Sequence, residues 1–118
     1  MRHQSFAVLA VASATVLSGC ESMITGGPLI RPGEPTGTII VQNNTSGNID
    51  VVSISDCDAS TYGLDRLPGD TAIGPGQSYS FTVSAGCWDV DAGAFGKGEA
   101  RQRMNVSAGG STRYTVTD

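Results

Sequence analysis

Histidine, lysine and cysteine are scarce in this sequence. Its 118 residues include one histidine, His3, one lysine, Lys97, and three cysteines. Imidazole is the commonest general base near neutral pH and the commonest transition-metal ligand. Because His3 lies in an N-terminal segment that we expect to be removed, serine-histidine and cysteine-histidine catalysis are excluded. Three cysteines are too few for a cysteine-only zinc site. We expect no enzyme activity and no cofactor.

Positive charge is scarce as well. Seven Lys and Arg residues stand against eleven Asp and Glu, which gives a formal net charge of −4. An acidic surface repels phosphate backbones and anionic headgroups, so we expect no nucleic-acid partner. The glycines around Lys97, at positions 93, 96 and 98, lack the spacing of a phosphate-binding loop and are typical of a hairpin loop.

No hydrophobic run is long enough to span a bilayer, which takes about 20 residues. The run from Phe6 to Leu17 follows a charged start and leads into Leu17-Ser18-Gly19-Cys20. This arrangement resembles the signal peptide and lipidation box of bacterial lipoproteins. The resemblance implies that residues 1–19 are removed, that Cys20 carries acyl chains and that the protein is anchored to a membrane through this lipid.

Residues 20–37 are expected to form a flexible linker between the lipid and one small domain, residues 38–118. The segment contains Gly26-Gly27-Pro28, Pro32-Gly33 and Glu34-Pro35, and it has no hydrophobic period. Glu21 follows the lipidated cysteine, where an aspartate would resemble the inner-membrane retention signal of enteric bacteria. The resemblance therefore implies the cell envelope, with the outer membrane facing the periplasm as the location.

The domain itself has an all-β pattern: short β-branched and aromatic runs alternate with Gly, Pro, Asn and Asp. About seven strands in about eighty residues predict an antiparallel, Ig-like β-sandwich. The expected strands are Thr38–Gln42, Ile49–Ser55, Thr71–Ile73, Gln77–Ser84, Cys87–Ala92, Glu99–Val106 and Ser111–Thr117.

Alternation within the strands assigns their buried faces. We expect the inward side chains to be Tyr79, Phe81 and Val83 in one strand, Trp88, Val90 and Ala92 in the next, and Thr112, Tyr114 and Val116 in the last. The phase of Ile49–Ser55 is ambiguous, because apolar side chains occur on both faces; a bulge or burial on two sides would explain it.

With Cys20 assigned to lipid, Cys57 and Cys87 remain as an even pair in an oxidising compartment, and we predict a disulfide between them. The bridge closes a loop of about 31 residues, for which chain entropy gives about 3.5 kcal/mol of stabilisation. A redox-active pair is the alternative, but the Cys-x-x-Cys motif is missing.

The bridge also brings acidic residues together. Four carboxylates, Asp56, Asp58, Asp89 and Asp91, could hold calcium. The competing interpretation is a cross-strand register that pairs Asp91 with Arg101 and Asp89 with Arg103, and that places Trp88 opposite Met104 inside. This register leaves Gln102 as a misfit that faces inward opposite Val90. We favour the charge ladder over calcium, so no metal is predicted.

Two aromatic residues on expected loops, Tyr62 and Phe95, are candidates for contact with a partner. Trp88 could instead form a sugar- or peptide-binding platform with Tyr62, but a domain of this size needs its few aromatics in the core.

Five segments together resemble a widespread group of small secreted bacterial β-sandwich domains. They are Ile39-x-Val-x-Asn43, Ile49-x-Val-Val-x-Ile-Ser55, Tyr62-Gly-Leu-Asp-Arg-Leu67, Ile73-x-Pro-Gly-x-Ser78 and Cys87-Trp-Asp-Val90. The resemblance covers most of 38–118 and implies no catalytic residue.

Three hypotheses follow. The first, which we favour, is a non-catalytic envelope lipoprotein that binds an envelope protein or supports an assembly. The second is a small inhibitor or ligand-binding lipoprotein that protects the envelope, with the loop 56–70 as its protruding element. The third is a carboxylate-only enzyme using Asp58 and Asp89, which would need two inward-facing acids in a deep cleft.

Overall fold

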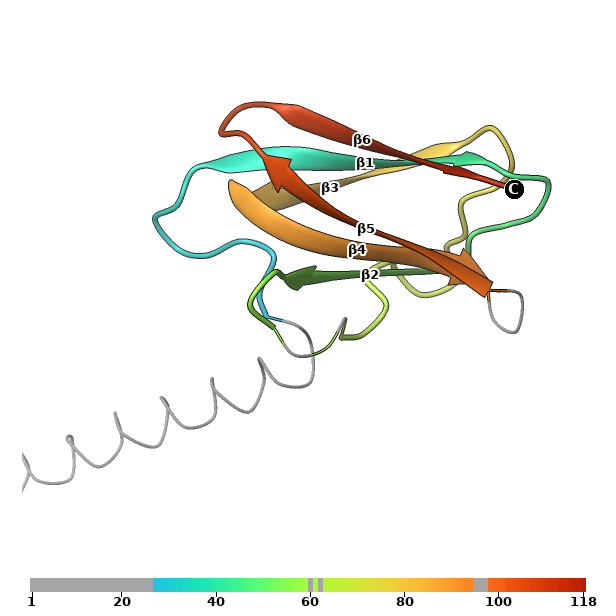
Figure 1. Cartoon of the computed structure of the whole chain (residues 1–118), viewed down its shortest axis with the longest axis horizontal. Coiled ribbons are helices and arrows are strands. Elements are labelled where there is room, and N and C mark those ends of the chain that lie inside the picture. The colour runs from blue at the N-terminus through green and yellow to red at the C-terminus, as the bar shows by residue number, and fades with distance from the viewer. Residues whose placement is uncertain (1–26, 60, 62, 95–97) are drawn as a thin grey trace, which may run out of the picture.

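A computed structural model describes residues 27–59, 61, 63–94 and 98–118 (Figure 1). The expected signal segment, Cys20, Tyr62 and Phe95 lie outside the described residues. The described residues contain no helix, and so none that could cross a membrane. They form six strands, β1 (Thr36–Asn44), β2 (Val51–Asp56), β3 (Ser78–Ser84), β4 (Gly86–Ala94), β5 (Gly98–Val106) and β6 (Ser111–Thr117).

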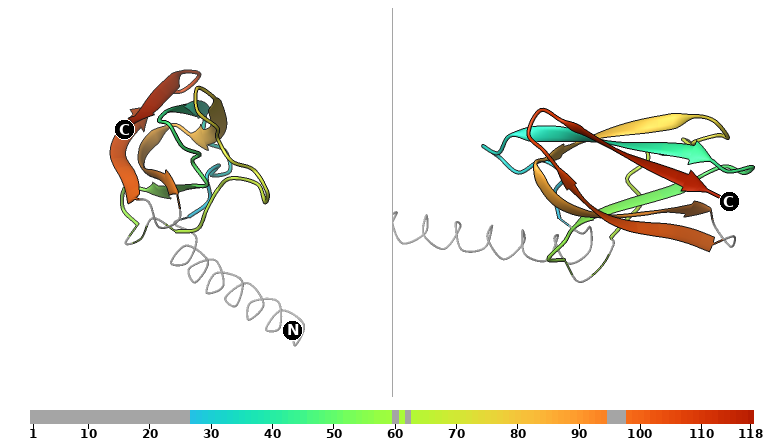
Figure 2. Two further views of the ribbon diagram at one scale, coloured as in Figure 1. Left: turned by 90° about the vertical axis from the view of Figure 1, so that its right-hand side faces the viewer. Right: turned by 45° about the horizontal axis from the view of Figure 1, so that its top comes forward.

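The strands form two three-stranded sheets, ordered β3-β1-β6 and β2-β4-β5, that face each other as two layers (Figure 2). The all-β, sandwich-like architecture is confirmed. The predicted strand number and Ig-like arrangement differ from it, because an Ig constant domain has seven strands in sheets of four and three. The expectation of purely antiparallel pairing is also wrong: β1 pairs with β6 in parallel, with Thr38 opposite Ser111.

The segment 71–73, predicted as a strand, is not one in the structure. Ile73 and Ile49 form a single antiparallel bridge, in which each backbone N–H donates to the other's carbonyl at 2.9 Å. Pro68 and Pro75 stand on either side of the segment, and a proline has no N–H to extend a ladder. Ile73 is nevertheless buried and closes the core between the two sheets.

The core lies between the layers and contains sixteen buried apolar residues from both sheets. Trp88 is the largest of its fully buried side chains. The expected inward faces are confirmed: Phe81, Val83, Val90, Tyr114 and Val116 are all buried, whereas the intervening Ser80, Thr82 and Thr115 are exposed. Tyr79 is half-buried and packs on the same cluster.

Strand β2 is buried on two sides, which resolves its ambiguous pattern. Val52 and Ile54 face the core, and Ser53 and Ser55 on the opposite face are also buried. Residues after the strand cover its edge: Asp65 bridges Ser53, and the Arg66 N–H donates to the Val52 carbonyl at 2.6 Å. Ile49 lies before the strand and is buried through its bridge to Ile73, so it does not belong to the alternation of β2.

The β4–β5 register is the one that the charges predict, with Asp91 opposite Arg101, Asp89 opposite Arg103 and Trp88 opposite Met104. Gln102 pairs with Val90 as expected, but it is exposed rather than enclosed. Strand β5 is an edge strand, and a cavity separates its first residues from the end of β6. Gln102, on this edge strand, is exposed to water.

Candidate functional site

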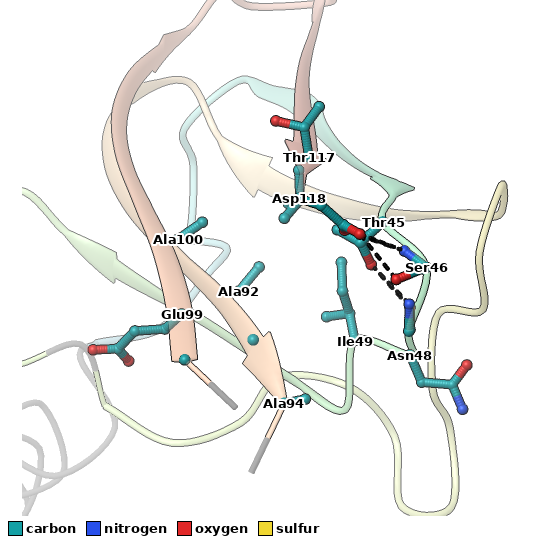
Figure 3. Close-up of a pocket in the computed structure, with 14 residues that line it drawn as sticks. Thr45, Ser46, Asn48, Ile49, Ala92, Ala94, Glu99, Ala100, Thr117 and Asp118 are labelled. Atoms are coloured by element: carbon teal, nitrogen blue, oxygen red, sulfur yellow. Dashed lines mark hydrogen bonds between the residues drawn. The ribbon is translucent and has the colours of Figure 1, made fainter. Parts of the chain in front are cut away.

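An open cavity of about 570 Å³ lies at one end of the sandwich (Figure 3). We call it the end cavity. Its lining comes from the loop after β1, the end of β4, the start of β5 and the end of β6: Thr45–Ile49, Ala92–Ala94, Gly98–Ala100 and Val116–Asp118. The residues that β4 and β5 contribute are mostly glycine and alanine, whose small side chains leave space between the two sheets at this end.

The end cavity combines an apolar base with polar rims. Ile49, Ala92 and Val116 are buried core residues that also border the cavity. On the rim, the Asp118 carboxylate accepts hydrogen bonds from the Ser46 N–H at 3.1 Å and from its hydroxyl at 2.9 Å. A site of this composition suits a ligand or a protruding side chain that has an apolar body and a hydrogen-bonding tip.

Asn43 fixes the loop that forms one wall of the end cavity. This fully buried side chain donates to the carbonyls of Gly47 and Ile73 at 2.8 and 2.7 Å. It accepts from the N–H and hydroxyl of Thr45 at 2.9 and 2.6 Å. One amide thereby ties the loop 45–47 to the segment that bears Ile73.

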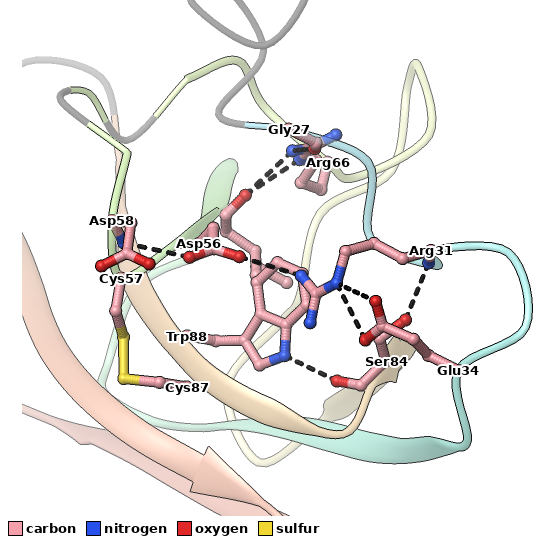
Figure 4. Close-up of polar contacts among 11 residues, drawn as sticks. Gly27, Arg31, Glu34, Asp56, Cys57, Asp58, Arg66, Ser84, Cys87 and Trp88 are labelled. Carbon is pink, nitrogen blue, oxygen red and sulfur yellow. Dashed lines mark hydrogen bonds and ion pairs between the residues drawn. A yellow bond between two sulfur atoms is a disulfide. The ribbon is translucent and has the colours of Figure 1, made fainter.

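The other end of the sandwich carries a docked segment that we call the strap, Gly27–Pro35. The sequence assigns these residues to the flexible linker, but the structure places them against the domain (Figure 4). The Ser84 N–H donates to the Leu29 carbonyl at 2.7 Å, and the Ala85 N–H donates to the Pro35 carbonyl at 2.8 Å. Leu29 packs against the apolar core.

A tight turn gives the strap its shape. The Glu34 N–H donates to the Arg31 carbonyl at 3.2 Å, with Pro32 and Gly33 between them and Gly33 at φ 80°. Proline followed by a positive-φ glycine is the signature of a type II turn. The sequence Arg-Pro-Gly-Glu is therefore a signal for this local turn, whereas the docking of the segment depends on residues far along the chain.

Arg31 is the centre of the contacts that hold the strap. Its guanidinium lies 5.0 Å from the centre of the Trp88 ring. Its Nε lies 2.8 Å from a Glu34 carboxylate oxygen, and one Nη donates to Asp56 at 2.9 Å. The hydrogen bond to Glu34 raises the pKa of Arg31, and the charges of Glu34 and Asp56 add to this effect. The cation is thus fixed over the most deeply buried aromatic side chain.

The strap is also bound where the described chain begins. The Arg66 guanidinium donates to the Gly27 carbonyl at 2.6 Å and to the Ile54 carbonyl at 3.0 and 3.2 Å. Burial lowers the pKa of Arg66. Because Arg66 lies in the segment after β2, this side chain joins the strap to the edge of the second sheet.

The predicted disulfide is confirmed: Cys57 and Cys87 are bridged, with their Cα atoms 5.6 Å apart. Figure 4 shows the bridge beside Asp56 and Trp88. Cys87 lies on the opposite face of β4 from the buried Trp88, so the bridge joins the loop after β2 to the outer face of the sheet. It differs in this from the inter-sheet disulfide of antibody domains.

The charge ladder on the outer face of β4 and β5 is present. Arg103 lies 2.9 Å from Asp89, and Arg101 lies 3.4 Å from Asp91. Asp91 is buried rather than exposed. Burial, with a smaller contribution from the nearby Glu99, raises the pKa of Asp91 to about 6, although Arg101 opposes the shift.

The four acids considered for calcium do not converge. Asp56, Asp89 and Asp91 each have an arginine partner, and Asp58 follows Asp56 in the loop. No group of three or more possible metal ligands occurs in the part of the chain that the structure describes. Arginine pairing is therefore the arrangement that the structure supports for this face.

The comparisons with known proteins add no relative. No protein-family model matches this chain, and no curated protein is significantly similar to it. The class that the structure defines is a small, disulfide-bridged, all-β protein with two facing three-stranded sheets.

Proposed function

We propose that this protein is a non-catalytic lipoprotein of the bacterial cell envelope, anchored to the outer membrane by lipid on Cys20 and facing the periplasm. Its sandwich binds another envelope protein or supports an envelope assembly. The single observation that carries the proposal is Leu17-Ser18-Gly19-Cys20 at the end of a short apolar run. The bridge between the two remaining cysteines is in keeping with an oxidising compartment.

The placement of the acids supports a binding role over a carboxylate enzyme. Such an enzyme would need two acids that converge in one cleft. Asp89 lies on the outer face of β4 with Arg103 as its partner, and Asp58 lies in the loop beyond β2. Neither residue lines the end cavity. The two acids that do line it, Glu99 and Asp118, are bonded to Arg101 and to Ser46.

The lipid anchor is tested with Cys20→Ala. We expect this variant to remain as unprocessed precursor without acyl chains, whereas the control Cys57→Ala is still processed and acylated because it affects only the bridge. Electrophoretic mobility and the intact mass of the membrane-extracted protein report both properties. Normal processing and membrane attachment of Cys20→Ala would refute the proposal.

Crosslinking in intact cells, followed by mass spectrometry of the captured neighbours, tests the binding role. We expect one envelope protein at a constant ratio to the lipoprotein. Its recovery should fall when the rim of the end cavity is changed by Ser46→Arg. The matched control is Ser80→Arg, an exposed position on β3 outside the cavity lining. The proposal fails if no envelope protein is enriched over an unrelated lipoprotein.

A second candidate is favoured by the end cavity itself. Its volume of about 570 Å³ is within the range of small-ligand sites. A small envelope-protecting inhibitor or ligand-binding lipoprotein would use this space or the loop 56–70. Recovery of a foreign hydrolase in the crosslinking experiment, or a co-purifying small molecule, would support this alternative.

A further inference from the structure

The strap places the start of the described chain at a defined end of the sandwich. Gly27 is bonded to Arg66, and Leu29 and Arg31 are bonded to Ser84. If Cys20 carries the lipid, only seven residue steps separate the anchor from Gly27. Such a length spans at most about 25 Å even when fully extended. A linker free as far as Gly37 would span about 60 Å, so docking of the strap brings the domain much closer to the membrane.

Two large apolar side chains are exposed in the strap and in the segment that binds it along the edge of β2. Ile30 and Leu64 are the two exposed large hydrophobic residues of the described chain, at 52% and 57% relative exposure. Ile30 belongs to the strap, and Leu64 lies two residues before Arg66, which binds Gly27. Figure 1 shows the first described residues and the loop after β2 on the same side of β2. One exposed apolar side chain therefore belongs to the strap, and the other belongs to the segment that binds the start of the strap.

The acids near the strap are partly paired within the protein, while Asp58 in the loop after β2 is exposed. Glu34 and Asp56 pair with Arg31, and the Asp65 carboxylate accepts the N–H groups of Val52 and Leu67 at 2.9 and 3.0 Å. The overall negative charge disfavours adsorption to anionic lipid, so apolar contact with a zwitterionic surface is the chemistry that fits.

The end cavity lies at the far end of the strands. Strand β4 begins at Gly86, next to the strap contacts at Ser84 and Ala85, and it ends at Ala94 in the cavity lining. Nine residues at about 3.3 Å each separate the two ends by roughly 25 to 30 Å.

We propose that the strap end rests on the lipid surface that holds Cys20, with Ile30 and Leu64 in contact with the lipid. The end cavity then faces away from the membrane, where a partner can reach it. This inference rests on the proposed lipid anchor.

The test uses the full acylated protein in vesicles of phosphatidylethanolamine and phosphatidylcholine. A photoreactive amino acid replaces Ile30, Leu64 or, as the control, Asn48, which is exposed in the cavity lining. After illumination, the intact mass reports lipid adducts and also the acyl chains on Cys20. We expect at least tenfold more lipid adduct at positions 30 and 64 than at position 48. Leu64→Glu should lower the adduct at position 30 several-fold, whereas Leu64→Met should not.

Equal adducts at all three positions, or more at position 48, would overturn the inference while leaving the lipid anchor intact. Capture of a protein instead of lipid at positions 30 and 64 would overturn it in the same way. An intact mass without acyl chains on Cys20 would refute the proposed function itself, and the inference with it.

Discussion

Replacement of Asn43, a buried polar residue near the end of β1, by alanine should strongly destabilise the protein. Asn43 is fully buried and makes four hydrogen bonds, each of which contributes about 0.5 to 1.5 kcal/mol. Not all of this is lost. Thr45 is half-buried, so water can replace its two bonds, and the Ile73 carbonyl keeps the Ile49 N–H at 2.9 Å. We expect Asn43→Ala to lower the free energy of unfolding by about 2 to 3 kcal/mol.

Urea unfolding followed by the fluorescence of Trp88, the only tryptophan, measures this loss. The matched control is Asn44→Ala at the adjacent exposed position, where the side chain accepts one long bond of 3.3 Å from Gln42. We expect this control to change stability by less than about 0.5 kcal/mol. A loss below 1 kcal/mol for Asn43→Ala, or one no larger than that of the control, would refute the assigned role of the buried amide.

Three further predictions concern the bridge, a buried acid and a close approach of strands. Combined Cys57→Ser and Cys87→Ser should cost about 3.5 kcal/mol, measured as a shift of the urea midpoint that dithiothreitol reproduces in the unchanged protein. Asp91→Asn should raise the thermal midpoint at pH 8 but not at pH 4. The pKa near 6 means that the folded state binds the proton more tightly than the unfolded state, so stability falls as pH rises through 4 to 6. Gly93→Ala should cost about 1 to 3 kcal/mol by urea unfolding, because its Cβ would lie 2.5 Å from the Gly98 carbonyl oxygen.

Each of these predictions has a control and a contrary result. Dithiothreitol should not destabilise the double serine variant further. A loss of less than about 1 kcal/mol in the free energy of unfolding would refute the entropic estimate for the bridge. The control for the buried acid is Asp89→Asn, which should not raise the thermal midpoint at pH 8, because the Asp89 carboxylate accepts a hydrogen bond from Arg103. Equal thermal midpoints for Asp91→Asn and the unchanged protein at both pH values would contradict the effect of burial. Gly47→Ala meets nothing within 4 Å and should be tolerated, and a neutral Gly93→Ala would mean that the hairpin can open.

The sequence predicts local features of this fold well. Alternation of side chains is a property of each strand by itself, so the inward faces of β3, β4 and β6 follow from the order of residues within each strand. The β4–β5 register is also local, because the two strands are joined by a short hairpin and carry opposite charges at matching positions. The turn at Gly74-Pro75-Gly76 is local as well, because proline followed by glycine favours it. In the structure Gly76 has φ 79°, and the Gln77 N–H donates to the Gly74 carbonyl at 3.0 Å.

The sequence does not predict which distant segments pair with one another. The parallel pairing of β1 with β6 joins residues more than seventy positions apart, and nothing in either strand specifies the other's direction. The strap looks like a linker because its residues have no period. Its order comes from groups that only the fold supplies, namely the Ser84 N–H, the Asp56 carboxylate and the face of Trp88.

The sequence by itself determined the all-β class, the buried faces and the pairing of Cys57 with Cys87, because these depend on local alternation and on which cysteines remain once Cys20 is assigned to lipid. The tertiary structure alone decided that the strap is docked, that Asp91 is buried and that a cavity opens at the end opposite the strap. These features arise where distant segments meet, and a one-dimensional pattern does not specify which surfaces come together.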